Sequence, residues 1–431
     1  MSTPRRVVIL TEDPVGEAMG GAAIRAYEMA RALATSAAVT LVAPGTPPPG
    51  LGPESYAPYR PGDTHELARL FAQADAIVLR PASPAISALA DRSGARVIFD
   101  LCDPLTLDML EARASAPAWE QQRWNTLTLD HLLDALHRGH HFICAGERQR
   151  DLYLGAMLAA RLITPAAYGA DPSFRSFIDC VPFGIPAQPP RGVPGVGPRA
   201  QIPGLTGDVR LLLWNGGIWN WLDPVTAVAA TARAHESDSR VRLVFMFGGG
   251  LDDEERSEAQ AARALAAELG LLDTVVFFNE AAIDYRDRGS WLLDADCFVA
   301  THRDHLEATF SFRTRLLDCF WTGTPAVGTE GGELSAILTA RDGGLSVPAG
   351  DVERLATAIL EVLGRGREAY RERLIAHGRK LTWPEAVGPL RRMIERDGRP
   401  KALGSPLVRR LSDPLRRGRA AVTRLVRAVR S

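Results

Sequence analysis

Short apolar runs alternate along the chain with amphipathic stretches whose apolar positions recur at the helical period. The helical patterns are clearest at Ala22–Leu33, Glu66–Phe71, Glu254–Leu269 and Phe312–Trp321. Strands that alternate with helices build βαβ units and parallel sheets, so the pattern predicts an α/β protein. The predicted strands are Val7–Leu10, Val39–Val42, Ala76–Leu79, Val97–Phe99 and Phe142–Cys144 in the first half, and Val209–Trp214, Val241–Phe247, Val275–Phe278, Cys297–Ala300 and Ala326–Val327 in the second.

A segment rich in proline and glycine, Val181–Gly207, separates the two series of strands and is typical of a linker. We therefore predict two doubly wound, Rossmann-like domains, residues 1–187 and 188–381, that face each other across a cleft. A terminal helix at 382–399 is expected to pack back across the domains, followed by a basic tail at 400–431. Ligands of open parallel sheets bind at the carboxyl ends of the strands, so we expect the chemistry in the cleft.

The composition is typical of a soluble globular protein, which predicts a cytoplasmic location. The 431 residues are 46% hydrophobic and 23% charged, and their formal net charge of −1 does not suggest binding to nucleic acid. Five scattered cysteines without a Cys-x-x-Cys pair indicate reduced core thiols. The N-terminus leads directly into a predicted strand and is too short for a signal peptide. No apolar stretch reaches the ~20 residues that span a bilayer.

Positive charge is concentrated at the C-terminal end. From Pro400 to Ser431, nine basic residues are opposed only by Asp413, so this segment carries +8 and the rest of the chain about −9. Leucines and valines recur between the arginines. As a helix this tail would be amphipathic and cationic, which favours attachment to an anionic membrane surface. A disordered, solvated tail is the alternative.

A glycine pair follows the first strand of each half. Glycines at a strand-to-helix turn let a ligand approach the backbone, and the helix N-terminus favours an anion. The spacing does not match a Rossmann dinucleotide fingerprint, and plain turn glycines or tryptophans packed in the core are the alternative. The candidate residues are Gly20 and Gly21 in the first half, and Asn215, Gly216, Gly217 and Trp219 in the second.

Two carboxylates, Asp100 and Asp103, come directly after a predicted strand. At the cleft edge such groups hold hydroxyls or act as bases, although aspartate is equally favoured as a helix cap or turn residue. No combination of histidines and acids has convincing metal-ligand spacing, so we expect neither a metal nor another cofactor.

The stretch from His305 to Glu333 carries the most specific pattern. It predicts a helix that starts at Ser311, with Arg313 and Arg315 in the first turn and Asp318 further along. Unpaired N–H groups and two arginines at a helix start would bind a phosphate, and Asp318 would meet sugar hydroxyls. An ordinary solvated amphipathic helix is the alternative interpretation.

Together, the Gly-Gly loop, the VPFGIP linker, the WNGG loop and the run RTRLLDCFWTGTPAVGTEGGE resemble GT-B-fold glycosyltransferases of family 4, especially members from polysaccharide and O-antigen biosynthesis. By this resemblance, the C-terminal domain binds a nucleotide-sugar and the N-terminal domain binds the acceptor. Asp318 takes the place of the family's ribose-binding glutamate. The family's second glutamate falls on Phe310, and Glu307 is the nearest acid.

The resemblance also shows where this chain departs from the family. A basic pair after the WNGG-like loop is replaced by Ile218-Trp219-Asn220, so Arg313 and Arg315 are the substitutes expected at the diphosphate. A family histidine in the N-terminal half has no clear match, and Asp100 or Asp103 is expected near its place. Asn279 and Glu280 follow a strand end and suit recognition of the base.

The resemblance implies a retaining, metal-independent glycosyltransferase that uses a nucleotide-diphosphate sugar and a glycan or lipid-linked acceptor in cell-surface polysaccharide or glycoconjugate biosynthesis. The N–H groups of Gly21 and Gly217, the helix start at Ser311 and Arg313 are expected to stabilise the leaving diphosphate. With no evident carboxylate nucleophile, attack on the front face is preferred. The alternatives are a non-catalytic scaffold with the same shape and a nucleotide-sugar epimerase.

Overall fold

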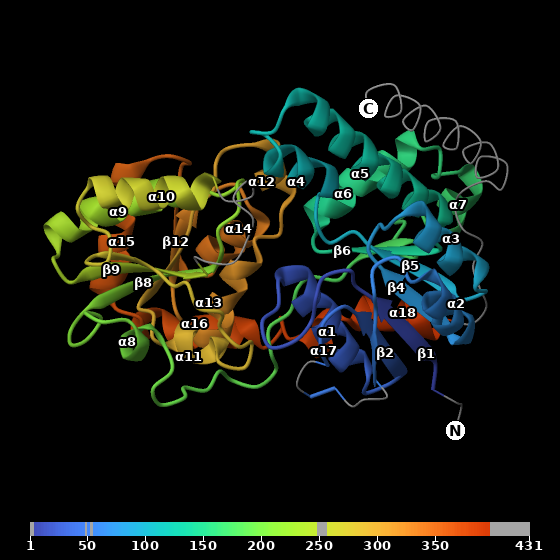
Figure 1. The fold of residues 1–431 in the computed structure, drawn as a ribbon, viewed down its shortest axis with the longest axis horizontal. Helices are drawn as coiled ribbons and strands as arrows, with labels where there is room; N and C mark the ends of the chain where they lie inside the picture. Colours follow the sequence, from blue (N-terminus) through green and yellow to red (C-terminus); the bar gives the residue numbers. More distant parts are fainter. Residues whose placement is uncertain (1–3, 48–49, 52–54, 248–256, 397–431) are drawn as a thin grey trace, which may run out of the picture.

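In the computed structural model, residues 4–47, 50–51, 55–247 and 257–396 are described. They form two α/β domains that lie side by side, each built on a parallel sheet (Figure 1). The predicted fold class, GT-B with two doubly wound domains, is confirmed. The tail at 400–431 lies outside the described residues, as do the first residues of the helix predicted at Glu254–Leu269.

The described N-terminal sheet has seven strands in the order β3-β2-β1-β4-β5-β6-β7, all paired in parallel. Because β1 has both β2 and β4 as neighbours, the chain reverses its direction of travel across the sheet beside β1, which opens a crevice at the carboxyl ends. The strands are β1 (Arg6–Leu10), β2 (Ala38–Ala43), β3 (Tyr56–Pro58), β4 (Ala76–Leu79), β5 (Arg96–Asp100), β6 (His141–Cys144) and β7 (Ile178–Cys180).

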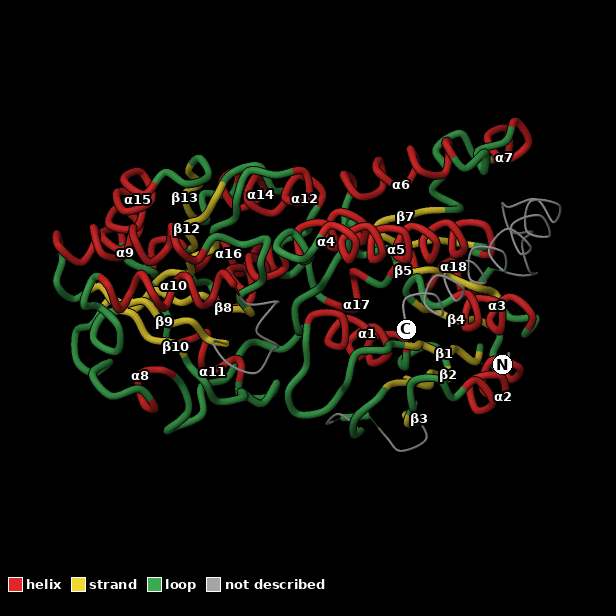
Figure 2. The backbone as a smooth tube through the Cα atoms, turned by 45° about the horizontal axis from the view of Figure 1, so that its top comes forward, coloured by secondary structure: helices red, strands yellow, loops and turns green. Residues whose placement is uncertain are grey.

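Helices cover both faces of this sheet, as the βαβ pattern requires (Figures 1 and 2). They are α1 (Gly21–Leu33), α2 (Thr64–Gln73), α3 (Pro84–Arg92), α4 (Leu105–Ala112), α5 (Ala118–Arg138), α6 (Glu147–Ala159) and α7 (Pro165–Ala170).

The C-terminal sheet has six described strands in the order β10-β9-β8-β11-β12-β13, again all parallel. Here the crevice opens between β8 and β11, the pair at which the strand order reverses. The strands are β8 (Arg210–Gly217), β9 (Val241–Phe247), β10 (Val276–Phe278), β11 (Cys297–Ala300), β12 (Ala326–Thr329) and β13 (Gly344–Val347).

The helical elements of this domain begin with α8 (Pro198–Gln201) in the linker. The next one, α9, has Asp223 as its cap: the carboxylate accepts from the Thr226 N–H at 3.0 Å, and Pro224 fills the first position. The elements are α9 (Pro224–Ser237), α10 (Ser257–Glu268), α11 (Arg288–Leu293), α12 (Leu306–Phe310), the 3-10 turn η3 (Thr314–Leu316), α13 (Leu317–Thr322), α14 (Glu333–Ala340), α15 (Val352–Arg365) and α16 (Glu368–Gly378).

After α16 the chain returns to the N-terminal domain as α17 (Trp383–Ala386) and α18 (Gly388–Glu395). The buried Arg96 guanidinium of β5 donates to the carbonyl oxygens of Met393 and Ile394 at the end of α18. In Figures 1 and 2, α18 lies against the N-terminal sheet, far from the domain that precedes it in the sequence.

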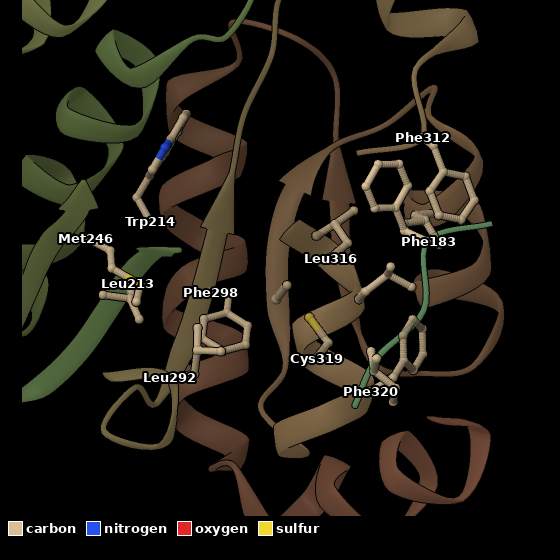
Figure 3. Close-up of a cluster of buried hydrophobic side chains, with 14 of the residues drawn as sticks. Phe183, Leu213, Trp214, Met246, Leu292, Phe298, Phe312, Leu316, Cys319 and Phe320 are labelled. Carbon is tan, nitrogen blue, oxygen red and sulfur yellow. The ribbon is translucent and has the colours of Figure 1, made fainter. Parts of the chain in front are cut away.

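Aromatic side chains join the linker to both neighbours. The ring of Phe183 lies 6.3 Å from that of Phe312 and 6.1 Å from that of Trp383, and Figure 3 shows Phe183 facing Phe312. All three side chains are buried, so the linker is part of the core where the domains meet.

The domains also touch directly at the start of α6. The Glu333 carboxylate, which belongs to α14 of the other domain, lies at the N-terminus of α6 beside the backbone N–H groups of Glu147 and Arg148. A Cβ added at Gly146 would collide with that carboxylate. Arg148 donates to the carbonyl oxygen of Gly331, so α6 binds the loop between β12 and α14 through its N-terminus and a side chain.

Among the described strands, the sequence patterns located all nine central ones but only β10 of the four edge strands. The sequence analysis gave no strand at β3, β7 or β13, because each is short and lies at the edge of its sheet or follows a loop. The predicted helix at Phe312–Trp321 is wrong: η3 and the short α13 take its place.

Candidate functional site

The carboxyl ends of β8, β11 and β12 meet beside the strand-order reversal of the C-terminal sheet. A small cavity of about 10 Å³ lies there, between residues from the ends of β11 and β12, the loop after β8, the η3 turn and α14. The residues around it are Leu222, Ala300, Thr301, His302, Arg313, Arg315, Leu316, Thr329 and Ser335.

Ser311 does not start a helix, which corrects the sequence prediction. It ends α12, and its hydroxyl donates back to the Glu307 carboxylate one turn earlier. The extended backbone at Ser311 turns the chain, and Arg313 then precedes a single 3-10 turn. The two arginines are therefore held by side-chain contacts, not by a helix N-terminus.

Arg313 binds Glu307 with both arms of its guanidinium. The Nη1–Oε1 distance is 3.0 Å and the Nη2–Oε2 distance is 2.6 Å, and both side chains are at most 9% exposed. This pairing neutralises Arg313, and it also leaves Glu307 without a free carboxylate oxygen. Arg313, which was expected at the diphosphate, is therefore not a free cation, and Glu307, the acid nearest to the position of the family's second glutamate, is engaged in the same ion pair.

Arg315 is in a different position. Its Nη2 donates to the Gly217 carbonyl at 3.0 Å, and the guanidinium lies 4.8 Å from the centre of the Trp214 ring. No salt bridge joins it to a carboxylate within the described residues. Burial, together with repulsion from Arg313, lowers the pKa of Arg315 to about 9. Among the predicted phosphate ligands, Arg315 is thus the cation that lacks an anion.

Asp318 is held by two side chains from other elements. The Asn215 amide at the end of β8 donates to Oδ2 at 2.7 Å, and Arg288 of α11 donates to Oδ1. Burial is the main effect on Asp318 and raises the pKa of its carboxyl group. The sequence analysis missed Arg288, because nothing near it in the sequence marks a contact with a residue 30 positions away.

Three buried polar atoms at this place have no hydrogen-bond partner among the described residues: Asn215 Oδ1, Arg313 Nε and Arg315 Nη1. Buried polar atoms in proteins are nearly always paired, so a group of them marks a place for a polar ligand. Two of the three are donors on guanidinium groups, which favours an anion.

His302 is a second residue that the sequence analysis missed. It follows β11, is 5% exposed and lines the cavity. Its backbone N–H donates to the Thr329 hydroxyl at 3.1 Å, which ties the ends of β11 and β12 together. Burial is the main cause that lowers the pKa of His302 to about 4, so the ring is neutral beside the arginines.

The WNGG loop ends β8 at this cavity. Trp214 is fully buried, as expected for core packing. The ring of Trp219 stacks on that of Trp221, with centroids 5.4 Å apart and planes within 4° of parallel. A Cβ at Gly216 would lie 3.4 Å from the Arg315 guanidinium carbon, so this glycine brings the backbone close to the arginine.

The other predicted donor ligands lie further out. Gly20 precedes α1 and Gly21 is its first residue, and the space beside both is open. Asn279 and Glu280 follow β10, which β9 separates from β8. The Asn279 amide donates to the Met246 carbonyl at 3.0 Å, and the exposed Glu280 pairs with Arg263. The structure does not bring these residues next to Arg315.

Asp100 does not face the cleft, which corrects another prediction. It is 3% exposed, and its two oxygens accept from Arg25 at 2.6 and 2.9 Å. Arg25 also donates to the Val181 carbonyl, so this ion pair holds the start of the linker on the N-terminal domain. Asp103 is more exposed and accepts from Arg80 at 2.8 Å.

The described ranges contain no group of three or more His, Cys, Asp or Glu side chains arranged to hold a metal ion. Among the same residues, no helix is long and apolar enough to cross a bilayer.

A known protein family matches the domain that contains this cavity. Residues 210–365 match the family model of group 1 glycosyl transferases. Over these residues, the chain is similar to the group 1 glycosyl transferases. The matched segment runs from the first residue of β8 to the last residue of α15, and it therefore includes the cavity and Arg315.

A curated relative of this chain is the D-inositol 3-phosphate glycosyltransferase of Acidothermus cellulolyticus, which is 30% identical over 224 residues. The match covers 51% of this chain and 47% of that protein, so it spans about half the length of the relative.

Solved structures share the fold over nearly the whole chain. Sucrose-phosphate synthase from Thermosynechococcus elongatus superposes with a TM-score of 0.60 at 18% identity, covering 90% of this chain and 99% of that one. Anabaena HepE in complex with UDP-glucose also gives 0.60, at 12% identity, covering 91% and 98%.

Proposed function

We propose that this protein is a glycosyltransferase that moves a sugar from a nucleotide-diphosphate sugar to an acceptor. The observation that carries the proposal is Arg315, a half-buried cation without a bound carboxylate at the crevice of the C-terminal sheet. A diphosphate supplies the missing anion and would stabilise the charged form, which burial disfavours.

Several neighbouring groups support a donor bound at this position. The unpartnered Asn215 Oδ1 and Arg315 Nη1 offer an acceptor and a donor at the end of β8. The family match covers this part of the chain, and the fold is shared with a protein solved with UDP-glucose. Asp318 lies beside Asn215 and is the candidate for a hydroxyl contact.

The engaged carboxylates favour attack on the front face, with retention of configuration. A double displacement requires a free carboxylate nucleophile, but both oxygens of Glu307 bind Arg313, and those of Asp318 bind Asn215 and Arg288. In the proposed reaction the sugar–phosphate bond breaks as the acceptor oxygen bonds to the anomeric carbon. The leaving phosphate takes the acceptor proton, and Arg315 stabilises the charge that develops on it.

Arginine and backbone N–H groups would stabilise the diphosphate in place of a metal ion, so turnover is proposed to be metal-independent. The acceptor is proposed to be a glycan or a lipid-linked glycan in cell-surface polysaccharide or glycoconjugate biosynthesis. Attachment of the basic tail to an anionic membrane would bring the enzyme to a lipid-linked acceptor.

The test combines nucleotide binding with turnover. UDP-, GDP- and dTDP-sugars are screened for thermal stabilisation of the full chain and for release of the nucleoside diphosphate, with and without EDTA. Arg315→Met should weaken binding of the matching nucleotide between tenfold and about 100-fold, because a charge-assisted contact contributes about 1.5–3 kcal/mol. Arg354→Met, an exposed arginine of α15 in the same domain, is the matched control.

Each outcome distinguishes the proposal from its alternatives. Binding without nucleotide release in the presence of sugar acceptors would favour a scaffold, and recovery of an epimerised donor would favour an epimerase. Unchanged affinity in Arg315→Met would show that the diphosphate lies elsewhere. Proton NMR of the product gives its anomeric configuration and tests retention.

A further inference from the structure

A second pocket lies in the N-terminal domain, at the carboxyl ends of β1 and β4. It has a volume of about 140 Å³ and does not include the residues assigned to the donor. Its floor is apolar, from the strand ends Leu10 and Leu79 and from Leu105 at the start of α4, and its polar wall is formed by Glu12, Asp13 and Arg80. An apolar floor with a few converging polar groups is the usual construction of a small-molecule site.

The net charge of this wall is negative. Arg80 donates to Asp103 at 2.8 Å and lies 3.9 Å from Asp13, so two carboxylates already offset its charge. Glu12, which lies on the same loop as Asp13, is a third carboxylate and lines the pocket. A bound anion would have to compete with Asp103 and Asp13 for Arg80 and would meet the charge of Glu12.

Asp108 of α4 is a further carboxyl group, which interacts with Asp103 of this domain and with Glu307 of the other domain. Burial raises the pKa of Asp108 well above its ordinary range, and repulsion from Asp103 and Glu307 adds to this effect. Glu307 belongs to α12, which packs against α4 across the domain interface. Asp108 Oδ1 is buried and has no hydrogen-bond partner among the described residues, but Asp108 does not belong to the residues that line the pocket.

We propose that this pocket binds the sugar acceptor, and that it selects a neutral or cationic polyol, such as a sugar or an amino sugar, over a phosphorylated one. Carboxylates accept hydrogen bonds from hydroxyl and ammonium groups, whereas a phosphate monoester would bring about −1.5 to −2 of charge towards Glu12 and Asp13. This assignment rests on the proposed function, since an acceptor implies a transferase. It separates the chain from its curated relative, which is named for D-inositol 3-phosphate.

The experiment compares matched probes on the full chain: glucosamine with glucosamine 6-phosphate, and inositol with D-inositol 3-phosphate. Dissociation constants are measured by saturation-transfer NMR, in the presence and absence of the nucleotide found in the donor screen. We expect the unphosphorylated member of at least one pair to bind tenfold or more tightly than its phosphorylated counterpart. The double variant Glu12→Gln/Asp13→Asn should reduce this difference to less than threefold.

Asp151→Asn, an exposed carboxylate on α6 of the same domain, is the matched control and should keep the preference. Circular dichroism melting establishes that the variants fold. Tighter or equal binding of the phosphorylated probes, an unchanged preference in the double variant, or no binding of any probe would overturn the inference. Absence of nucleotide binding together with an intact preference would contradict the proposed function and would still support the charge selectivity of the pocket.

Discussion

Two arginines that are two positions apart have different roles in this molecule. Arg313 is paired with Glu307 through both guanidinium arms, whereas Arg315 lies over Trp214 without a bound carboxylate. The sequence made both residues equal candidates for a diphosphate. The difference arises because the chain turns at Ser311 and brings Glu307 back onto Arg313.

This contrast gives a stability prediction for Arg313. Arg313→Met should lower the free energy of unfolding by about 3–5 kcal/mol, because it leaves the buried Glu307 carboxylate without a partner. The double variant Arg313→Met/Glu307→Leu should recover most of this loss. Urea unfolding followed by tryptophan fluorescence provides the measurement.

The matched comparison is Arg315→Met, which should weaken nucleotide binding without a loss of this size. A loss below about 1 kcal/mol in Arg313→Met would contradict the structural role of the pair, because exposed ion pairs contribute no more than that.

At the level of elements, the sequence predicted what depends on local pattern. The apolar runs identified the nine central strands and the edge strand β10 within about three residues at each end, because buried parallel strands are continuously apolar. The sequence also identified the glycines at the end of β8. It did not reveal contacts between distant residues. Asp100 was predicted to be free at a strand end, but it binds Arg25, which lies 75 residues earlier.

The same limit applies to the candidate site. Asp318 was identified from its place in a motif, but its partner Arg288 belongs to α11, and no pattern links the two segments. Glycine content and charge reveal a ligand loop, whereas the pairing of buried charges depends on how elements pack. Sequence therefore indicates which residues gather at the sheet edge better than it indicates which of them stay free.

Strand β6 gives a prediction for pH dependence. His141 is 3% exposed, its Nδ1 lies 2.8 Å from the Ser176 carbonyl oxygen, and burial lowers its pKa to about 4. Between this value and the unfolded pKa of about 6.5, the unfolded chain binds more protons, so stability falls as the pH falls. From pH 7 to pH 5, His141 should contribute a loss of about 2 kcal/mol.

Urea unfolding at both pH values tests this contribution. In His141→Asn the loss of unfolding free energy between pH 7 and pH 5 should be smaller than in the unsubstituted protein by about the same 2 kcal/mol. His65→Asn, an exposed histidine of α2, is the control and should leave the loss unchanged. Identical pH dependence in His141→Asn and the unsubstituted protein would refute the assignment.

Over the whole molecule, residues 1–399 carry a formal charge of about −9, and the tail at 400–431 carries +8. We predict that the full chain sediments with vesicles of phosphatidylcholine and phosphatidylglycerol, and that a truncation at Pro400 binds them at least 100-fold more weakly. The reason is that each basic residue near an anionic surface contributes about 1 kcal/mol.

Vesicles of phosphatidylcholine alone are the control for charge. Equal sedimentation of the full chain and the truncation would contradict a role for the tail. The truncated protein should retain nucleotide binding, because the donor residues belong to the C-terminal sheet and its loops.

The contact between Gly146 and Glu333 has a consequence for the evolution of the family. A side chain at position 146 would push the Glu333 carboxylate off the N-terminus of α6, and a shorter or uncharged residue at 333 would leave those N–H groups without their anion. A substitution at only one of the two positions is therefore expected to weaken this contact. Across homologous sequences that keep this interface, the two positions should therefore covary, and the pair would mark lineages in which the domains meet in the same way.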